Sequence, residues 1–152
     1  MPLGNYELER GKIMSFENMK DIKTGEIHER SCMMMYCFTP QEMRQIMNVA
    51  RMTGVKDIIT LKPNLGGNKI REILDNKAVE TEVECIKEKT VIFNGIPSQR
   101  VSLFIDGLKK CRIKRPIIAI VTEQTIDWTL EDLLINLANE RSSINRGDFS
   151  AH

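Results

Sequence analysis

Apolar residues in this chain fall into two kinds of run: short continuous runs, and longer runs in which the apolar residue recurs every three or four positions. The continuous runs lie at 32–38, 58–61, 91–93 and 116–121, and each has the length of a strand. Continuity, rather than alternation with polar residues, is typical of strands covered on both faces. The pattern therefore predicts four core strands, and the runs at 33–38 and 117–121 favour helices on both faces of a sheet.

The helical periodicity is clearest directly after the first strand, where apolar residues form one stripe. Thr39 stands at the cap position, Pro40 at the first helical position, and Glu42 three residues after the cap, which predicts a capping box. Gly54 supplies a left-handed stop, so we predict a helix over 40–53. Similar stripes predict three further helices, at 69–75, 98–111 and 130–141.

The remaining segments give weaker predictions. Residues 78–89 alternate acidic and apolar side chains, which fits a solvated edge strand or a continuation of the preceding helix. Ser98 is the predicted cap of one later helix, and Asp127 or Thr129 that of the last. Gly107 inside a helix is expected to let another backbone approach closely.

The order strand, helix, strand, helix occurs in residues 32–76 and again in 90–141. A shift of 58 positions places Ala50 on Leu108 within matching helix stripes, and the next strands agree as Ile58-Ile59 against Ile117-Ile118. We therefore predict an α/β fold, a single compact domain of two tandem β-α-β-α halves. Its sheet is either ferredoxin-like, with the helices on one face, or doubly wound, with helices on both.

This domain is expected to span residues 32–141. Residues 1–31 have scattered apolar positions and are predicted to be a loosely ordered extension, while 142–152 are predicted to form a flexible tail.

Charge and hydropathy narrow the classes of partner. The 152 residues contain 22 Lys and Arg against 21 Asp and Glu, a net charge of +1, so nucleic-acid binding is not expected. No apolar run approaches the ~20 residues that span a bilayer, and no secretory signal stands at the start, so we expect a cytoplasmic protein without membrane contact. One local basic cluster could contact phosphates or complement a helix dipole, and we favour the dipole. It consists of Lys109, Lys110, Arg112, Lys114 and Arg115.

The residue types that usually carry chemistry are sparse. The four cysteines, Cys32, Cys37, Cys85 and Cys111, lack C-x-x-C spacing, so we interpret them as reduced, buried thiols and expect neither a metal site nor a cofactor. The two histidines lie near or at the ends of the chain, in segments expected to be mobile. No catalytic constellation emerges, so an enzyme is the least favoured of the functions considered.

The loops after the second strand of each half, at 62–68 and 122–129, are the candidate binding region, because ligands of open α/β sheets gather at strand C-terminal ends. The glycines of the first loop could cradle a phosphate, but G-x-G-x-x-G spacing is absent and close packing explains them as well. Trp128 either anchors the last helix or lines a site. The candidate ligand-binding residues are Pro63, Asn64, Gly66, Gly67, Thr122, Asp127 and Trp128.

The C-terminal third carries a recognisable pattern, VIFNGIPSQRVSLFIDGLKK and then RPIIAIVTEQTIDWTLEDLL. Its features are an apolar strand ending in a turn at Gly95, a second strand ending in Thr122, and Trp128 before a Leu-rich helix. This pattern resembles the uncharacterised bacterial family called domain of unknown function 3783. The resemblance implies a degenerate upstream copy at 33–74. Thr125-Ile126-Asp127 departs from the more polar, Asn-bearing turn that the family implies.

The family has no established activity, so the resemblance implies a fold and leaves function open. We expect a non-catalytic binding or regulatory module for a small molecule or a protein partner. The alternative is a self-associating structural protein, in which an exposed strand edge or a Met-rich surface forms a homodimer.

Overall fold

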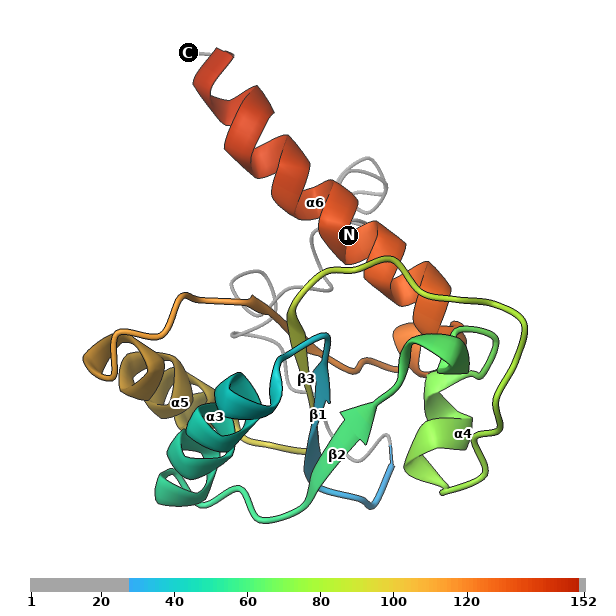
Figure 1. Ribbon diagram of the computed structural model, residues 1–152, viewed down its shortest axis with the longest axis horizontal. Helices are drawn as coiled ribbons and strands as arrows, with labels where there is room; N and C mark the ends of the chain where they lie inside the picture. The colour runs from blue at the N-terminus through green and yellow to red at the C-terminus, as the bar shows by residue number, and fades with distance from the viewer. Residues whose placement is uncertain (1–27, 151–152) are drawn as a thin grey trace, which may run out of the picture.

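Each half of the chain folds in the same order, as a strand, a helix, a strand, a 3-10 turn and a helix (Figure 1). The computed structural model describes residues 28–150, with side chains to residue 142. The extension predicted at 1–31 therefore lies outside the described residues up to residue 27, as does His152. The first half contains β1 (Cys32–Tyr36), α3 (Pro40–Met52), β2 (Ile58–Leu61), η1 (Pro63–Leu65) and α4 (Ile70–Leu74). The second contains β3 (Thr90–Asn94), α5 (Ser98–Lys110), β4 (Ile117–Ile120), η2 (Thr125–Asp127) and α6 (Leu130–Ser150).

The four strands form one mixed sheet in the order β2-β1-β3-β4. Each half pairs its own two strands in parallel, β1 with β2 and β3 with β4, while β1 and β3 join the halves as antiparallel neighbours. The α/β fold with two β-α-β-α halves is therefore confirmed. The antiparallel centre distinguishes the sheet from an all-parallel doubly wound one.

Helices cover both faces of this sheet. In Figure 1, α3 and α5 lie together on one side of the strands and α4 and α6 on the other. Two separate apolar cores result, one beneath each helix pair. The ferredoxin-like alternative, with helices on one face, is wrong, because the continuous apolar runs of β1, β3 and β4 bury side chains on both faces of the sheet.

β1 shows why the sequence needs two cores. Met33 and Met35 pack toward α3 and α5, whereas Met34 and Tyr36 pack toward α4 and α6, since successive side chains of a strand point to opposite faces. All three methionines of this strand are fully buried, so they form no Met-rich surface, and the expected homodimer stays a prediction.

Three contacts join corresponding positions of the two halves. Met34 pairs with Ile92 at the sheet centre, and a side chain at Gly107 would meet Val49 where α5 crosses α3; both pairs are 58 positions apart. Lys69 and Thr129, 60 positions apart, form an antiparallel bridge beyond the other face. An approximate twofold axis therefore runs through the sheet and both helix layers.

The register corrects one detail of the sequence alignment. Met33 pairs with Ile58, and its counterpart Val91 pairs with Ile118. Ile58 therefore corresponds to Ile118 rather than to Ile117. The separation of corresponding residues is 58 positions at Met33 and Val91 and 60 positions at Ile58 and Ile118, which a constant shift cannot represent.

The helix ends test the cap predictions. The capping box at Thr39 and Glu42 is confirmed, with the Glu42 N–H donating to Thr39 Oγ1 at 3.2 Å and the Thr39 N–H to Glu42 Oε1 at 2.9 Å. Ser98 is not a cap, because it is the first helical residue of α5 and Pro97 occupies the cap position. Thr129 caps α6, accepting the Asp132 N–H at 3.2 Å. Gly107 admits the Val49 side chain of α3 rather than another backbone.

Two segments differ from the expected secondary structure. Residues 78–89 form neither an edge strand nor a helix. Their backbone pairs instead with the loop around η1, through Thr81 N to Asn64 O at 2.8 Å and Cys85 N to Pro63 O at 2.9 Å. α6 continues to Ser150, past its expected end near residue 141.

Candidate functional site

The two loops predicted to bind a ligand meet each other in the structure. Leu130 N donates to Asn68 O at 2.9 Å, and Ile70 N donates to Trp128 O at 3.0 Å, in a reciprocal pattern at corresponding positions. β2 and β4 run in opposite directions at opposite edges of the sheet, so the loops do not share one row of strand ends. They meet instead over the face covered by α4 and α6.

The glycine loop uses its backbone donors internally. Gly66 N donates to Val83 O at 3.2 Å, and Gly67 N donates to Thr81 Oγ1 at 3.1 Å. A Cβ atom on Gly66 would lie 2.6 Å from Val83 O, so this glycine is needed for close packing of segment 78–89. The two glycine N–H groups are therefore occupied by protein acceptors rather than presented to a phosphate.

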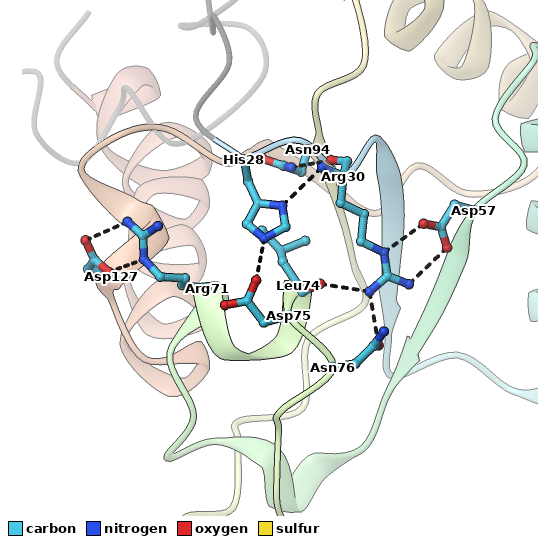
Figure 2. Close-up of polar contacts among 9 residues, drawn as sticks. All are labelled: His28, Arg30, Asp57, Arg71, Leu74, Asp75, Asn76, Asn94 and Asp127. Atoms are coloured by element: carbon cyan, nitrogen blue, oxygen red, sulfur yellow. Dashed lines mark hydrogen bonds and ion pairs between the residues drawn. The ribbon is translucent and has the colours of Figure 1, made fainter.

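The second loop is also tied internally. Thr122 and Thr125 exchange side chain to backbone hydrogen bonds of 2.9 and 3.0 Å. Asp127 pairs with Arg71 of α4 at 2.9 Å, and this hydrogen bond is the main reason why the pKa of Asp127 is lowered (Figure 2). Trp128 is half-buried against the core beneath α4 and α6.

The first loop retains one unsatisfied group among the described residues, because Asn64 Oδ1 is buried without a hydrogen-bond partner. Pro63 is exposed beside it, and its carbonyl accepts the Cys85 N–H. Ligand binding by the seven predicted residues stays a prediction. The first loop nevertheless holds residues 78–89, and Asp127 and Trp128 bond to α4. We therefore look for the better candidate site elsewhere.

A second polar cluster fixes the chain before β1 (Figure 2). Arg30 donates to both carboxylate oxygens of Asp57, at 2.7 and 3.1 Å, and to Leu74 O at 3.0 Å, closing the end of α4. His28 Nε2 lies 2.7 Å from Asp75, while His28 Nδ1 accepts the Arg30 N–H at 3.1 Å. Both ring nitrogens are therefore engaged, which leaves neither to exchange a proton with a substrate.

A cleft of about 620 Å³ lies between the start of α3 and the loop that follows α5. Residues 87–89 before β3 and Arg141 of α6 complete its wall. Basic side chains dominate the lining: Lys87, Lys89, Arg112, Lys114, Arg115 and Arg141. Glu42 and Glu88 are the acidic residues that line it. We call this feature the basic cleft.

One of the two acids is already neutralised by a lysine. Glu42 Oε2 lies 2.5 Å from Lys89 Nζ, and this hydrogen bond, followed by the one from the Thr39 N–H, lowers the pKa of Glu42. Arg112, Lys114 and Arg115 lie beyond the last residue of α5. Complementing the helix dipole explains Lys109 and Lys110 in the last turn, and it does not explain these three. The position of these three cations after the end of the helix was the feature of the sequence that could have indicated the cleft.

Two residues of the basic cleft hold backbone conformations that favour glycine. Cys37 has φ 73° and Arg112 has φ 58°. Their counterparts 58 positions away are Gly95, with φ 70°, and Gly54, with φ 92°. A non-glycine residue in this region costs roughly 1–2 kcal/mol. Glycine would form each of these turns without strain. Cys37 and Arg112 instead place a thiol and a guanidinium in the cleft at the cost of a strained backbone.

The cysteines divide into two pairs by environment. Cys32 and Cys85 are buried, and burial raises the pKa of each thiol to about 12. Cys37 is half-buried and Cys111 is exposed, and both line the basic cleft. All four are free thiols, so the reading of buried, inert cysteines fits the first pair only.

Over residues 28–142, no group of three or more His, Cys, Asp or Glu side chains is arranged to hold a metal ion. Within that same part of the chain, no helix has the length and apolar character needed to cross a membrane.

Comparison with known proteins finds one family. Residues 89–144 match the family model described as Domain of unknown function (DUF3783). The matched region begins at Lys89, contains β3, α5 and β4, and reaches into α6, so it includes most cations of the basic cleft. It is the second half of the fold, where the resemblance was seen. No curated protein and no solved structure matches the chain.

Proposed function

We propose that this protein is a non-catalytic binding module whose basic cleft takes an anionic small molecule bearing a phosphate or several carboxylates. The observation that carries the proposal is the strained Arg112, held at a left-handed position inside a cleft lined by cations. Strain of this kind persists where the surrounding structure enforces it, and such positions cluster at binding sites.

The size and chemistry of the cleft support a small ligand. A volume of about 620 Å³ lies within the usual range for sites that hold a molecule of drug or metabolite size. Arg112 offers a planar fork for two oxygens of one phosphate or carboxylate, while Lys114 acts as a point charge. A ligand that uses both would be fixed in orientation by the arginine and attracted by the lysine.

We further infer that the two halves arose by duplication, with the first half as a degenerate copy of the family unit. The paired registers and the left-handed residues at corresponding positions support this origin. On this interpretation the ancestral turns carried glycine, and Cys37 and Arg112 replaced it on the side of the molecule that acquired the basic cleft.

The proposal is tested by calorimetric titration and thermal shift with adenosine monophosphate and citrate as anionic probes and adenosine as the neutral match. A ligand at 100 times its Kd adds about 2.7 kcal/mol of stability, which is a rise of several degrees for a chain of this length. Binding should weaken with added salt, because the exposed cations are screened.

Three variants locate the site. Arg112→Gly keeps the turn and removes the guanidinium, and Lys114→Ser removes a second cation; each should weaken probe binding at least about tenfold, the effect of losing a charged hydrogen bond. Arg100→Ser removes an exposed cation of α5 outside the basic cleft and should bind as the wild type does. The proposal fails if neither anion binds, or if both cleft variants retain wild-type affinity.

A further inference from the structure

Although the net charge of the chain is near zero, basic residues predominate on one side of the sheet and acidic residues on the other. Helices α3 and α5 carry five basic residues against two acidic ones. On the opposite side, residues 69–84 and 130–138 carry seven acidic residues against three basic ones. A net charge near zero therefore says little about the field at either face.

The outer surface of α3 and α5 combines this positive charge with exposed apolar side chains. Met52 at the end of α3 is 80% exposed and Leu103 on α5 is 55% exposed. The Arg100 guanidinium lies 3.6 Å from where a side chain on Gly54 would stand, which places it over the turn that follows α3. We call this surface the basic face; its exposed cations are Arg44, Arg51, Arg100, Lys109 and Lys110.

The basic face has little acidic charge of its own. Glu42 sits at the start of α3 and pairs with Lys89, and Asp106 is the acid of α5. None of its five cations lines the basic cleft. The basic face and the basic cleft are therefore separate surfaces that can be altered independently.

A surface of opposite character lies on the far side of the sheet. Residues 79–84 alternate exposed Glu80, Glu82 and Glu84 with apolar or hydroxyl residues. Val79 is 64% exposed and Val83 is 41% exposed. In Figure 1 this stretch passes around the outside of α4, away from α3 and α5. We call it the acidic segment.

The acidic segment is held in one conformation although it forms no strand. Thr81 N donates to Asn64 O at 2.8 Å, Val83 O accepts the Gly66 N–H at 3.2 Å, and Val79 N donates to Asn68 Oδ1 at 3.0 Å. A segment fixed in this way loses less conformational entropy on docking than a mobile loop does.

We propose that the acidic segment of one copy of this protein docks on the basic face of a second copy. Charge complementarity carries the argument, because three exposed glutamates would meet a surface with five exposed cations. Apolar complementarity supports it: the four large apolar side chains that stand exposed in residues 28–142 all belong to these two surfaces, two on each.

The two surfaces lie on opposite sides of one molecule, so they meet only between molecules. Because the contact joins different patches, it is heterologous, and successive copies form a chain or a closed ring rather than an isologous dimer. Exposed ion pairs are individually weak and are screened by salt, so the association is concentration-dependent and strongest at low ionic strength.

Sedimentation velocity of the full chain at rising concentration, at about 20 mM and about 500 mM salt, measures this association; the Debye length at these two values differs about fivefold. The weight-average sedimentation coefficient should rise with concentration at low salt and return to the monomer value at high salt. A wild-type protein that stays monomeric at low salt overturns the proposal.

Two charge-reversal variants and their mixture identify the surfaces. Glu80→Lys/Glu82→Lys/Glu84→Lys and Arg44→Glu/Arg51→Glu/Arg100→Glu should each be monomeric, because like charges then face each other in every contact. Mixing them should restore association, since the altered segment of one now complements the altered face of the other. A loss of folding cannot mimic this rescue, and circular dichroism of each variant checks the fold directly.

Glu123→Lys reverses an exposed charge outside both surfaces and should associate as the wild type does. The Arg44→Glu/Arg51→Glu/Arg100→Glu variant keeps every residue of the basic cleft, so anion binding should persist in it. The anion-binding proposal and the self-association proposal can therefore be tested independently. Association that survives both triple variants, or a mixture that stays monomeric, overturns the contact. Salt-sensitive binding of duplex DNA by a monomer through Arg44, Arg51 and Arg100 would assign the basic face to nucleic acid instead.

Discussion

The two halves have the same left-handed backbone conformation at corresponding turns, but they place different residues there. After its first strand and after its first helix, each half turns through a left-handed residue. The first half has Cys37 and then Gly54 at these turns, and the second has Gly95 and then Arg112. The two non-glycine residues come from different halves, yet both line the basic cleft.

The symmetry of the two halves explains why all four turns are left-handed. A strained, non-glycine residue at such a turn indicates a role beyond forming the fold. The fold requires the left-handed turn at all four positions, and glycine meets that requirement at lowest cost. Elsewhere the halves differ without strain: Arg30 forms an ion pair with Asp57, whereas the position that corresponds to Arg30 before β3 holds Glu88. The positions that replace glycine are therefore the informative ones.

The largest effect is expected where corresponding residues bury the same core. Ile70 and Leu130 are the first residues of α4 and α6, and both are fully buried. Ile70→Ala and Leu130→Ala should each lower the free energy of unfolding by about 2–5 kcal/mol, because each leaves a cavity. Denaturant titration measures both. A loss below about 1 kcal/mol in only one variant would show that the halves do not share the core equally.

A smaller effect is expected at the crossing of α3 and α5. A Cβ on Gly107 would lie 2.6 Å from Val49 Cγ1. The overpacking in Gly107→Ala should therefore lower the free energy of unfolding by about 1–3 kcal/mol. The higher helix propensity of alanine should offset ~1 kcal/mol of this loss. Adding Val49→Ala should recover much of that loss, and a double-mutant cycle measures the coupling. Strict additivity of the two changes would contradict the close contact.

A change of opposite sign is expected at the strained turn. Arg112→Gly should raise the free energy of unfolding by about 1 kcal/mol while weakening anion binding, because glycine relieves the left-handed conformation. The matched change Gly54→Ala introduces strain at the corresponding turn and should lower stability by a similar amount. Denaturant midpoints test both, and an Arg112→Gly variant no more stable than the wild type would remove the evidence for strain.

The smallest effect concerns acid. The hydrogen bond from Arg30 is the main reason why the pKa of Asp57 lies below its usual value. A carboxylate with a depressed pKa stabilises the fold above its unfolded pKa of about 3.9 and loses that contribution as the pH falls through the folded value. Asp57→Asn should therefore flatten the fall in melting temperature below about pH 4. The change is modest, because the carboxylate is partly exposed and water screens the pair. If the melting temperature of Asp57→Asn falls with pH as steeply as that of the wild type, groups other than Asp57 cause the loss of stability in acid.

Local patterns in the sequence were sufficient for the elements and their order. Continuous apolar runs marked strands buried on both faces, and the Thr39 to Glu42 capping box marked the start of α3. These signals depend on near neighbours, so they survive without knowledge of the fold. Ser98 misled for the same reason: a hydroxyl before a helical stripe is a cap only if the backbone turns there, and Pro97 moved that turn by one residue.

The candidate site could not be found in this way. The sequence located loops 62–68 and 122–129 and their correspondence, but an open sheet with common strand ends was assumed, whereas β2 and β4 run in opposite directions. The loops consequently bond to each other. The cations of the basic cleft were visible as a cluster after α5, and their union with Lys87, Lys89 and Arg141 required the packing of three distant segments.

The sequence by itself determined four strands, their helices, two halves in tandem and the glycines that turn them, because each follows from periodicity, capping or backbone sterics over a few residues. The tertiary structure decided the antiparallel join between β1 and β3, the gathering of Cys37 and Arg112 in one cleft, and the segregation of charge to opposite faces. These depend on which segments pack together, and a net charge or a local pattern carries no information about neighbours that are distant in the chain.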